Sequence, residues 1–204
     1  MKRLAVLVSG GGSNLQSIID STKNGILKGI AEVSLVISNN PNAFGLQRAN
    51  KENIKNIAFD YKLMNPEEYD KQMLSALKDY KVDLICMAGY LKKLPDIIVN
   101  EYKNKILNIH PALLPKFGGK GMYGHFVHEA VVKSKEKKTG ATVHFADGNY
   151  DTGKIIIQNT IDILESDTAD DVAKKVLGIE HEIYPQAIKK VIENNKWKNI
   201  YILL

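Results

Sequence analysis

Short apolar runs rich in β-branched residues alternate with longer amphipathic segments along the first half of the chain. Short apolar runs that are bounded by turn residues are typical of strands buried on both faces of a sheet. The pattern predicts strands over residues 4–8, 33–37, 84–87 and 106–109, and a weaker pattern predicts one over residues 56–59.

The segments between these strands carry apolar residues at helical spacing, over residues 14–21, 43–52 and 66–79. The third segment begins with Pro66, Glu67 and Glu68, residue types that are favoured in the first turn of a helix. Strands that alternate with helices form a mostly parallel sheet with helices on both faces. The first half is therefore predicted to be a nucleotide-type α/β fold.

The pattern changes after Pro115, where a glycine-rich stretch is followed by a short helix predicted near residues 128–134. Extended runs over residues 141–145 and 154–161 then enclose a turn-rich loop. A last helix is predicted to begin at Thr168, because Thr168 and Asp171 have the spacing of a capping box. Apolar residues fall on one face of this helix: Val172, Val176, Ile179 and Ile183. We find no repeat or linker, so residues 1–204 are predicted to form one domain.

The motif that says most about chemistry lies at the end of the strand predicted over residues 106–109. Asn108 and His110 are two residues apart, and side chains with this spacing in a strand point to the same face. Pro111 prevents a regular continuation, so both should lie at the carboxyl end of the sheet, where open α/β sheets bind ligands. An amide beside a protonatable imidazole can stabilise an oxyanion and transfer a proton, as acyl transfer to an amine requires. A polar turn after a buried strand is the alternative interpretation.

A glycine-rich turn, from Ser9 to Leu15, joins the first predicted strand to the first predicted helix. Its glycines and the helix start at Ser13 and Asn14 suit a phosphate, because the unpaired amides and the helix dipole attract anions. The alternative is a tight turn with Ser13 as the helix N-cap. A dinucleotide fingerprint would need glycine in place of Leu15, and a P-loop would need a Lys-Ser/Thr pair, so neither NAD nor a nucleoside triphosphate is expected.

The loop over residues 146–153 carries two carboxylates, Asp147 and Asp151. If the second half packs against the strand that ends at His110, Asp151 can pair with the imidazole, raise its pKa and keep it protonated. An Asx-type turn is the alternative interpretation of this loop. The neighbouring His144 is expected to be a buried structural histidine rather than a partner in the cluster.

Composition narrows the class of protein further. The chain has 28 Lys and Arg against 23 Asp and Glu, and because the basic residues are scattered they favour a small anionic substrate over nucleic acid. The single cysteine, Cys86, excludes a disulfide within the chain and fits a reducing cytoplasm. No apolar run is long enough for a membrane span or a signal peptide. The histidines lack zinc-site spacing, so no metal is expected.

Several motifs, in this order and spacing, resemble the phosphoribosylglycinamide formyltransferase family of purine biosynthesis. They are residues 10–16, 87–91, 108–115 and 151–153, with further similarity at residues 119–125 and 180–185. The resemblance extends from residue 1 to about residue 195. It implies a formyltransferase fold with a Rossmann-like mononucleotide-binding half, about residues 1–110, that holds the phosphoribosyl substrate. The second half, about residues 111–204, would complete a cleft for 10-formyltetrahydrofolate.

The resemblance also implies roles for particular residues. Asn108, His110 and Asp151 match the catalytic positions, and the substrate phosphate would bind at Gly12, Ser13 and Asn14, with Glu180 at the glycinamide or ribose end. The folate side would be lined by Leu91, Lys92, Lys93, Leu94, Asn108 and Asp147. Pro66 stands where many members carry an arginine, and Lys62 is a candidate to replace that folate contact.

Three other functions remain open at this point. A relative that formylates methionyl-tRNA would need a further tRNA-binding domain, and a formyltetrahydrofolate hydrolase usually carries an N-terminal regulatory domain, whereas the first strand here begins at Leu4. A non-catalytic phosphometabolite-binding module is the third. We expect a monomer or a homodimer, and residues 197–204 either pair as an edge strand or pack on a helix.

Overall fold

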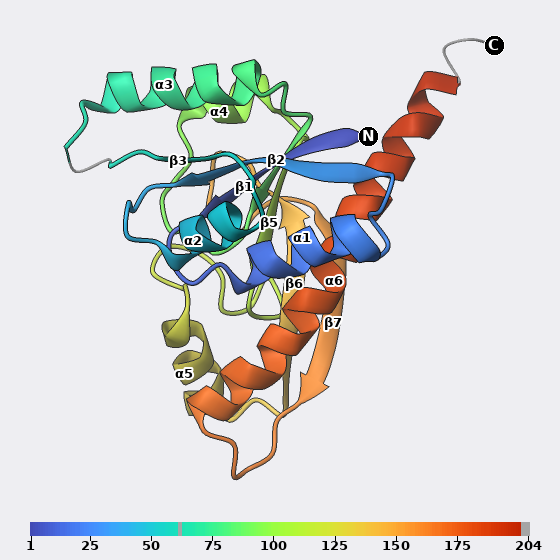
Figure 1. Cartoon of the computed structure of the whole chain (residues 1–204). Helices are drawn as coiled ribbons and strands as arrows, with labels where there is room; N and C mark the ends of the chain where they lie inside the picture. Colours follow the sequence, from blue (N-terminus) through green and yellow to red (C-terminus); the bar gives the residue numbers. More distant parts are fainter. Residues whose placement is uncertain (61–62, 201–204) are drawn as a thin grey trace.

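The computed structural model describes residues 1–60 and 63–200, and one seven-stranded sheet lies at its centre (Figure 1). The strand order is β3-β2-β1-β4-β5-β6-β7, with the first five strands parallel and β6 and β7 antiparallel. The strands are β1 (Lys2–Val8), β2 (Ala31–Ser38), β3 (Asn56–Ala58), β4 (Leu84–Met87), β5 (Ile106–His110), β6 (Lys138–Phe145) and β7 (Ile155–Asp162). The predicted mostly parallel α/β sheet is confirmed.

Helices cover both faces of the sheet, with α3 and α4 on one face and α1 and α6 on the other (Figure 1). The helices are α1 (Ser13–Asn24), α2 (Phe44–Lys51), α3 (Pro66–Asp79), α4 (Asp96–Glu101), α5 (His125–Lys133) and α6 (Ala169–Ile200). The sequence pattern does not predict α4, because a helix this short is too brief to show a period. Among the described residues, no helix is both long and apolar enough to cross a membrane.

Alternation along β1 shows why the parallel strands read as continuous apolar runs. Leu4, Val6 and Val8 are buried in the cluster that includes side chains of α1 and α6. Ala5 and Leu7 are buried in the opposite cluster, which includes side chains of α3 and α4. Because both faces of the sheet are covered, every position from Leu4 to Val8 is apolar, and only Lys2 and Arg3 at the start of the strand are polar.

The last helix, α6, starts where the capping box predicts. Thr168 Oγ1 accepts a hydrogen bond from the Asp171 amide at 3.2 Å, and Asp171 Oδ2 accepts one from the Thr168 amide at 3.0 Å. Further along, Pro185 has no N–H to donate to the carbonyl of His181, and Ser17 Oγ of α1 donates to that carbonyl at 2.7 Å. This hydrogen bond joins α1 to α6.

Helix α6 also includes residues 197–200, whereas residues 201–204 lie outside the described part of the chain.

The strand order determines at which edge of the sheet a ligand-binding crevice forms. Chain order runs from β1 outward to β2 and β3 on one side, and from β4 to β5 on the other. Such a reversal leaves a crevice at the carboxyl ends of the two central strands, since the connections leave in opposite directions. The segments that follow β1, β4 and β5 therefore meet at this point.

Candidate active site

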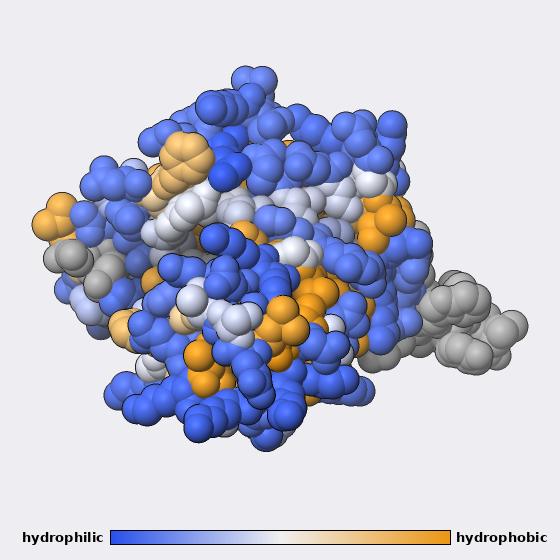
Figure 2. Space-filling model, turned by 90° about the horizontal axis from the view of Figure 1, so that it is seen from below, coloured by the Kyte–Doolittle hydropathy of each residue, from blue (hydrophilic) through white to orange (hydrophobic). Residues whose placement is uncertain are grey.

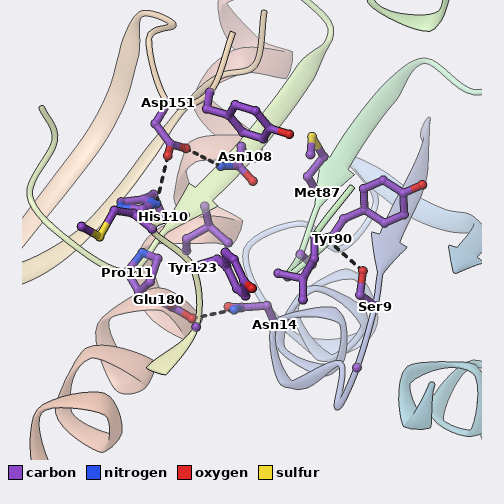
Figure 3. A pocket seen from close by; sticks show the side chains of 18 of the residues that line it. Ser9, Asn14, Met87, Tyr90, Asn108, His110, Pro111, Tyr123, Asp151 and Glu180 are labelled. Carbon is purple, nitrogen blue, oxygen red and sulfur yellow. Dashed lines mark hydrogen bonds and ion pairs between the residues drawn. The ribbon is translucent and has the colours of Figure 1, made fainter. Parts of the chain in front are cut away.

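A cavity of about 650 Å³ opens at the carboxyl ends of β1, β4 and β5 (Figure 3). Every site residue predicted from the sequence lines it: Gly12, Ser13, Asn14, Leu91, Lys92, Lys93, Leu94, Asn108, His110, Asp147, Asp151 and Glu180. The two halves of the chain thus contribute to a single cavity, and the geometry within it decides what each group can do.

The glycine-rich turn opens helix α1 toward the cavity. Gly12 precedes the helix with φ +69°, and a Cβ atom there would lie 2.7 Å from the Gly45 Cα atom, so both its conformation and its packing require glycine. Gly12, rather than Ser13, is the N-cap, and within the described residues no side chain caps this helix. The first amides of α1 therefore remain available to an anion. Arg48 Nε holds the turn by donating to the Gly11 carbonyl at 2.8 Å.

A buried polar pair lies beside this turn. Asn14 Nδ2 of α1 donates to Glu180 Oε2 of α6 at 2.6 Å (Figure 3). Burial raises the pKa of Glu180 above its usual range, although the hydrogen bond from Asn14 opposes this shift. Asn14 Oδ1 has no hydrogen-bond partner among the described residues. The pair is thus placed to bond a donor group of a ligand that binds at the turn.

Asn108 and His110 both face the cavity from the end of β5, as their spacing predicts. Asp151, from the β6–β7 loop, lies between them, with its Oδ2 3.5 Å from His110 Nδ1 and its Oδ1 3.4 Å from Asn108 Nδ2 (Figure 3). The Gly119 amide also donates to Asp151 Oδ2, at 2.9 Å. The predicted pairing of Asp151 with His110 is confirmed. The two residues are 41 positions apart in the sequence, and the fold brings the β6–β7 loop to the end of β5.

The expectation that Asp151 keeps His110 protonated is wrong, although Asp151 does act to raise the pKa of His110 as expected. Burial lowers the pKa of His110 below its ordinary value, and this effect exceeds the opposing effects of Asp151 and the Phe117 carbonyl. His110 Nε2 lies 2.7 Å from that carbonyl, which can only accept, so Nε2 carries a hydrogen. At pH 7 the imidazole is therefore mainly neutral, and Nδ1, beside Asp151, is the nitrogen that can take up a proton.

His144 contacts both Asn108 and Asp151, which corrects its expected role as a structural histidine outside this cluster. Its side chain is buried, and its Nε2 atom lies 3.1 Å from Asn108 Nδ2 and 3.4 Å from Asp151 Oδ1. The β5–β6 register places His144 directly opposite Asn108. Burial acts to raise the pKa of Asp151, but the hydrogen bond with His144 and the charge of His110 outweigh it and lower that pKa. Asp151 therefore stays ionised near neutral pH.

The β6–β7 loop that carries Asp151 is shaped by a close approach at Gly153. A Cβ atom at Gly153 would lie 1.7 Å from the Phe145 carbonyl oxygen, whereas one at Gly148, in the same loop, would meet nothing within 4 Å. We expect Gly153→Ala to lower kcat about 100-fold, because an ångström of displacement at Asp151 disturbs the cluster, and to lower Tm by several degrees. Gly148→Ala is the matched control in the same assay and melting curve. Equal behaviour of the two variants would contradict this account of the loop.

The segment after β4 forms the opposite wall of the cavity. Leu91 is 54% exposed, whereas Leu94 is buried. Residues 92–94 also border a second cavity of about 350 Å³, together with Pro66, and Lys93 Nζ lies 3.5 Å from Asp96 Oδ1. Lys62, the candidate for the missing arginine contact, lies outside the described residues. Asp147, across the cavity, accepts hydrogen bonds from the Asn149 amide and from Thr152 Oγ1.

Several cavity residues were not predicted from the sequence: Ser9, Met87, Tyr123, His128 and Lys174. His128 is buried on α5, and burial lowers its pKa to about 4. Ser9 begins the glycine-rich turn, and Met87 and Tyr123 lie within the motifs at residues 87–91 and 119–125, so these three had a sequence signal. His128 and Lys174 reach the cavity through helix packing, for which the local sequence gives no pattern.

A Rossmann-like sheet with a polar cluster where the strand order reverses is typical of ligand-binding α/β proteins. Comparison with known proteins identifies the family within this class. The chain matches the formyl transferase family over residues 2–188 and belongs to that family. Within it, the chain is 40% identical over 193 residues to the chloroplastic phosphoribosylglycinamide formyltransferase of Vigna unguiculata, spanning 94% of this chain and 61% of that protein. It is also 40% identical to the trifunctional purine biosynthetic protein adenosine-3 of Drosophila melanogaster, over 94% of this chain and 14% of that protein.

The fold shows the same similarity. The crystal structure of glycinamide ribonucleotide transformylase 1 from Symbiobacterium toebii aligns with a TM-score of 0.88 at 36% identity, covering 95% of this chain and 89% of that one. Phosphoribosylglycinamide formyltransferase from Bacillus halodurans aligns with a TM-score of 0.86 at 34% identity, covering 94% of this chain and 95% of that one.

Proposed function

We propose that this protein transfers the formyl group of 10-formyltetrahydrofolate to the amine of 5-phosphoribosylglycinamide, a step in de novo purine (IMP) biosynthesis. The observation that carries the proposal is that an anion-binding turn and the cluster of Asn108, His110 and Asp151 open into one cavity. Its volume, about 650 Å³, is within the usual range for small-molecule sites. The proposal includes a cytoplasmic location and a monomer or homodimer.

In this proposal the substrate phosphate binds the amides of Ser13 and Asn14, where a helix N-terminus favours negative charge. The pair of Asn14 and Glu180 accepts a hydrogen bond from a hydroxyl or amine group of the same substrate. The formyl donor lies across the cavity, against Leu91, Lys92, Lys93 and Leu94, with Asp147 on the facing loop. This arrangement places the acceptor amine and the formyl carbon beside Asn108.

The chemistry follows from these positions. The neutral amine attacks the formyl carbon, and Asn108 and His110 stabilise the tetrahedral oxyanion that forms. Because His110 is mainly neutral beforehand, it takes up a proton from solvent water as negative charge develops on the oxyanion, and ionised Asp151 stabilises the resulting imidazolium. His110 returns this proton to water when the oxyanion collapses, and the proton of the attacking amine passes through water to the folate nitrogen. The carbonyl then re-forms as the bond between that nitrogen and the formyl carbon breaks.

A comparison of acceptors tests this proposal. Tetrahydrofolate release is measured with phosphorylated substrate, with its 5′-dephospho analogue and with no acceptor. We expect release only with an amine acceptor, and the dephospho analogue should lose both affinity and kcat, because phosphate binding fixes the amine near the formyl carbon. We expect its kcat/KM to fall by about three orders of magnitude, and inorganic phosphate to compete with the substrate.

Equal rates in all three reactions would show that water is the acceptor, and the protein would then be a formyltetrahydrofolate hydrolase. No release under any condition would favour a non-catalytic phosphometabolite-binding module. The two alternatives are thus separated by the same assay.

A further inference from the structure

Ser9 lies at the junction of three strand ends beside the cavity. It follows β1, and its amide donates to the Gly89 carbonyl after β4 at 3.0 Å. Its hydroxyl accepts a hydrogen bond from the Leu91 amide at 2.8 Å (Figure 3). The same hydroxyl donates to Asn39 Oδ1, after β2, at 2.5 Å. The hydroxyl thus uses its single hydrogen and one lone pair within the protein.

These contacts join the two walls that the proposed function assigns to different substrates. On one side, Ser9 is directly followed by the glycines of the phosphate-binding turn. On the other side, the Leu91 amide begins the segment proposed to hold the formyl donor. Ser9 hydrogen-bonds the chain after β4 at the Gly89 carbonyl and the Leu91 amide, which are both backbone groups, so these bonds act on the position of the backbone itself.

The hydrogen bonds of the Ser9 hydroxyl link its position to both walls of the cavity. Asn39 is buried, so it fixes where the hydroxyl hydrogen points and thereby aims a lone pair at the Leu91 amide. If phosphate binding shifts the glycine-rich turn, Ser9 moves with it, and the hydrogen bond to Leu91 is the contact that would carry this shift across the cavity. Two sites that share such an element are linked reciprocally, because each ligand then favours the same arrangement.

We propose that Ser9 is a positioning residue that couples the two substrate sites, so that the phosphorylated amine bound at the turn increases the affinity of the folate at residues 91–94. This inference rests on the proposed function. It adds that the affinities of the two substrates are not independent and that one hydroxyl links them.

Equilibrium titration of the whole protein tests the coupling. The probe is tetrahydrofolate, which lacks the transferable formyl group, and its Kd is measured with and without saturating phosphoribosylglycinamide. We expect the parent to bind it about fivefold more tightly when the amine is present, the scale of a typical coupling that depends on one hydrogen bond. In Ser9→Ala the ratio should fall to about one, with the Kd for tetrahydrofolate alone nearly unchanged.

Three further variants separate coupling from a structural effect. Ser9→Thr keeps a hydroxyl and should restore the ratio, whereas Asn39→Ala should reduce it by freeing the Ser9 hydroxyl. Ser34→Ala is the matched control, because Ser34 is a half-buried serine of β2 whose hydroxyl donates to the Leu4 carbonyl at 3.2 Å. It should leave the ratio at the parent value.

A parental ratio in Ser9→Ala, or a ratio of one in the parent, would overturn the inference. Equal weakening of tetrahydrofolate binding with and without the amine would also overturn it, since Ser9 would then only maintain the folate wall. Failure of the proposed function is a different result, because the parent would not transfer formyl groups to the phosphorylated amine at all.

Discussion

Replacing Asn108 by alanine is expected to lower kcat by about two to three orders of magnitude, the usual cost of removing one donor from an oxyanion site. Asn108 Nδ2 is held by His144 and by a long contact of 3.4 Å to Asp151. Such a long hydrogen bond is weak, so the amide can redirect this N–H to donate a hydrogen bond to the oxyanion, the stronger acceptor that forms in the transition state. The measurement is steady-state kinetics with both substrates.

The affinity for the phosphorylated amine should stay close to that of the parent, because the turn at Gly12 does not contact Asn108. Asn56→Ala is a suitable control, since Asn56 is a half-buried asparagine on the edge strand β3 and its Nδ2 donates to Asn50 Oδ1 at 2.7 Å. A kcat for Asn108→Ala within about threefold of the parent would make Asn108 a structural residue and remove it from the proposed mechanism.

Replacing Asp151 by asparagine is expected to lower kcat about 100-fold at neutral pH, the scale of a group that supports proton transfer. The change keeps the shape of the side chain but removes the charge that stabilises the imidazolium of His110. Asp151 raises the pKa of His110 while burial lowers it, so loss of the carboxylate should lower this pKa further. An NMR titration of His110 in the parent and the variant should show this decrease in pKa.

The pH dependence has a definite sign. His110 of the variant should require a lower pH than that of the parent to become protonated, so lowering the pH should recover part of the lost activity. Asp162→Asn is the control, because it removes an exposed carboxylate on β7 that lies 3.6 Å from Lys138 Nζ. An unchanged pKa of His110 in Asp151→Asn would mean that the two groups are not energetically coupled, despite their distance of 3.5 Å.

Helix α3 and the start of α6 show how far local sequence reaches. The predicted bounds of α3, residues 66–79, agree with the structure because Pro66 and two glutamates fit a first helical turn and Asn65 caps it. The capping box at Thr168 likewise specifies the start of α6. The glycine-rich turn and the Asn108-x-His110 spacing also predict which side chains share a face. These features depend on residues a few positions apart, whose geometry the backbone fixes locally.

Only the tertiary structure decides how these segments act together. Hydrophobic pattern does not specify strand direction, so the antiparallel pairing of β6 with β5 was not predicted, and that pairing brings His144 opposite Asn108. Burial and charge compete at His110, and the result depends on atoms from distant segments, which no local pattern contains. The sequence by itself thus determined the elements and the reactive groups, whereas packing determined their partners and protonation, because both depend on long-range contacts and on exclusion of water.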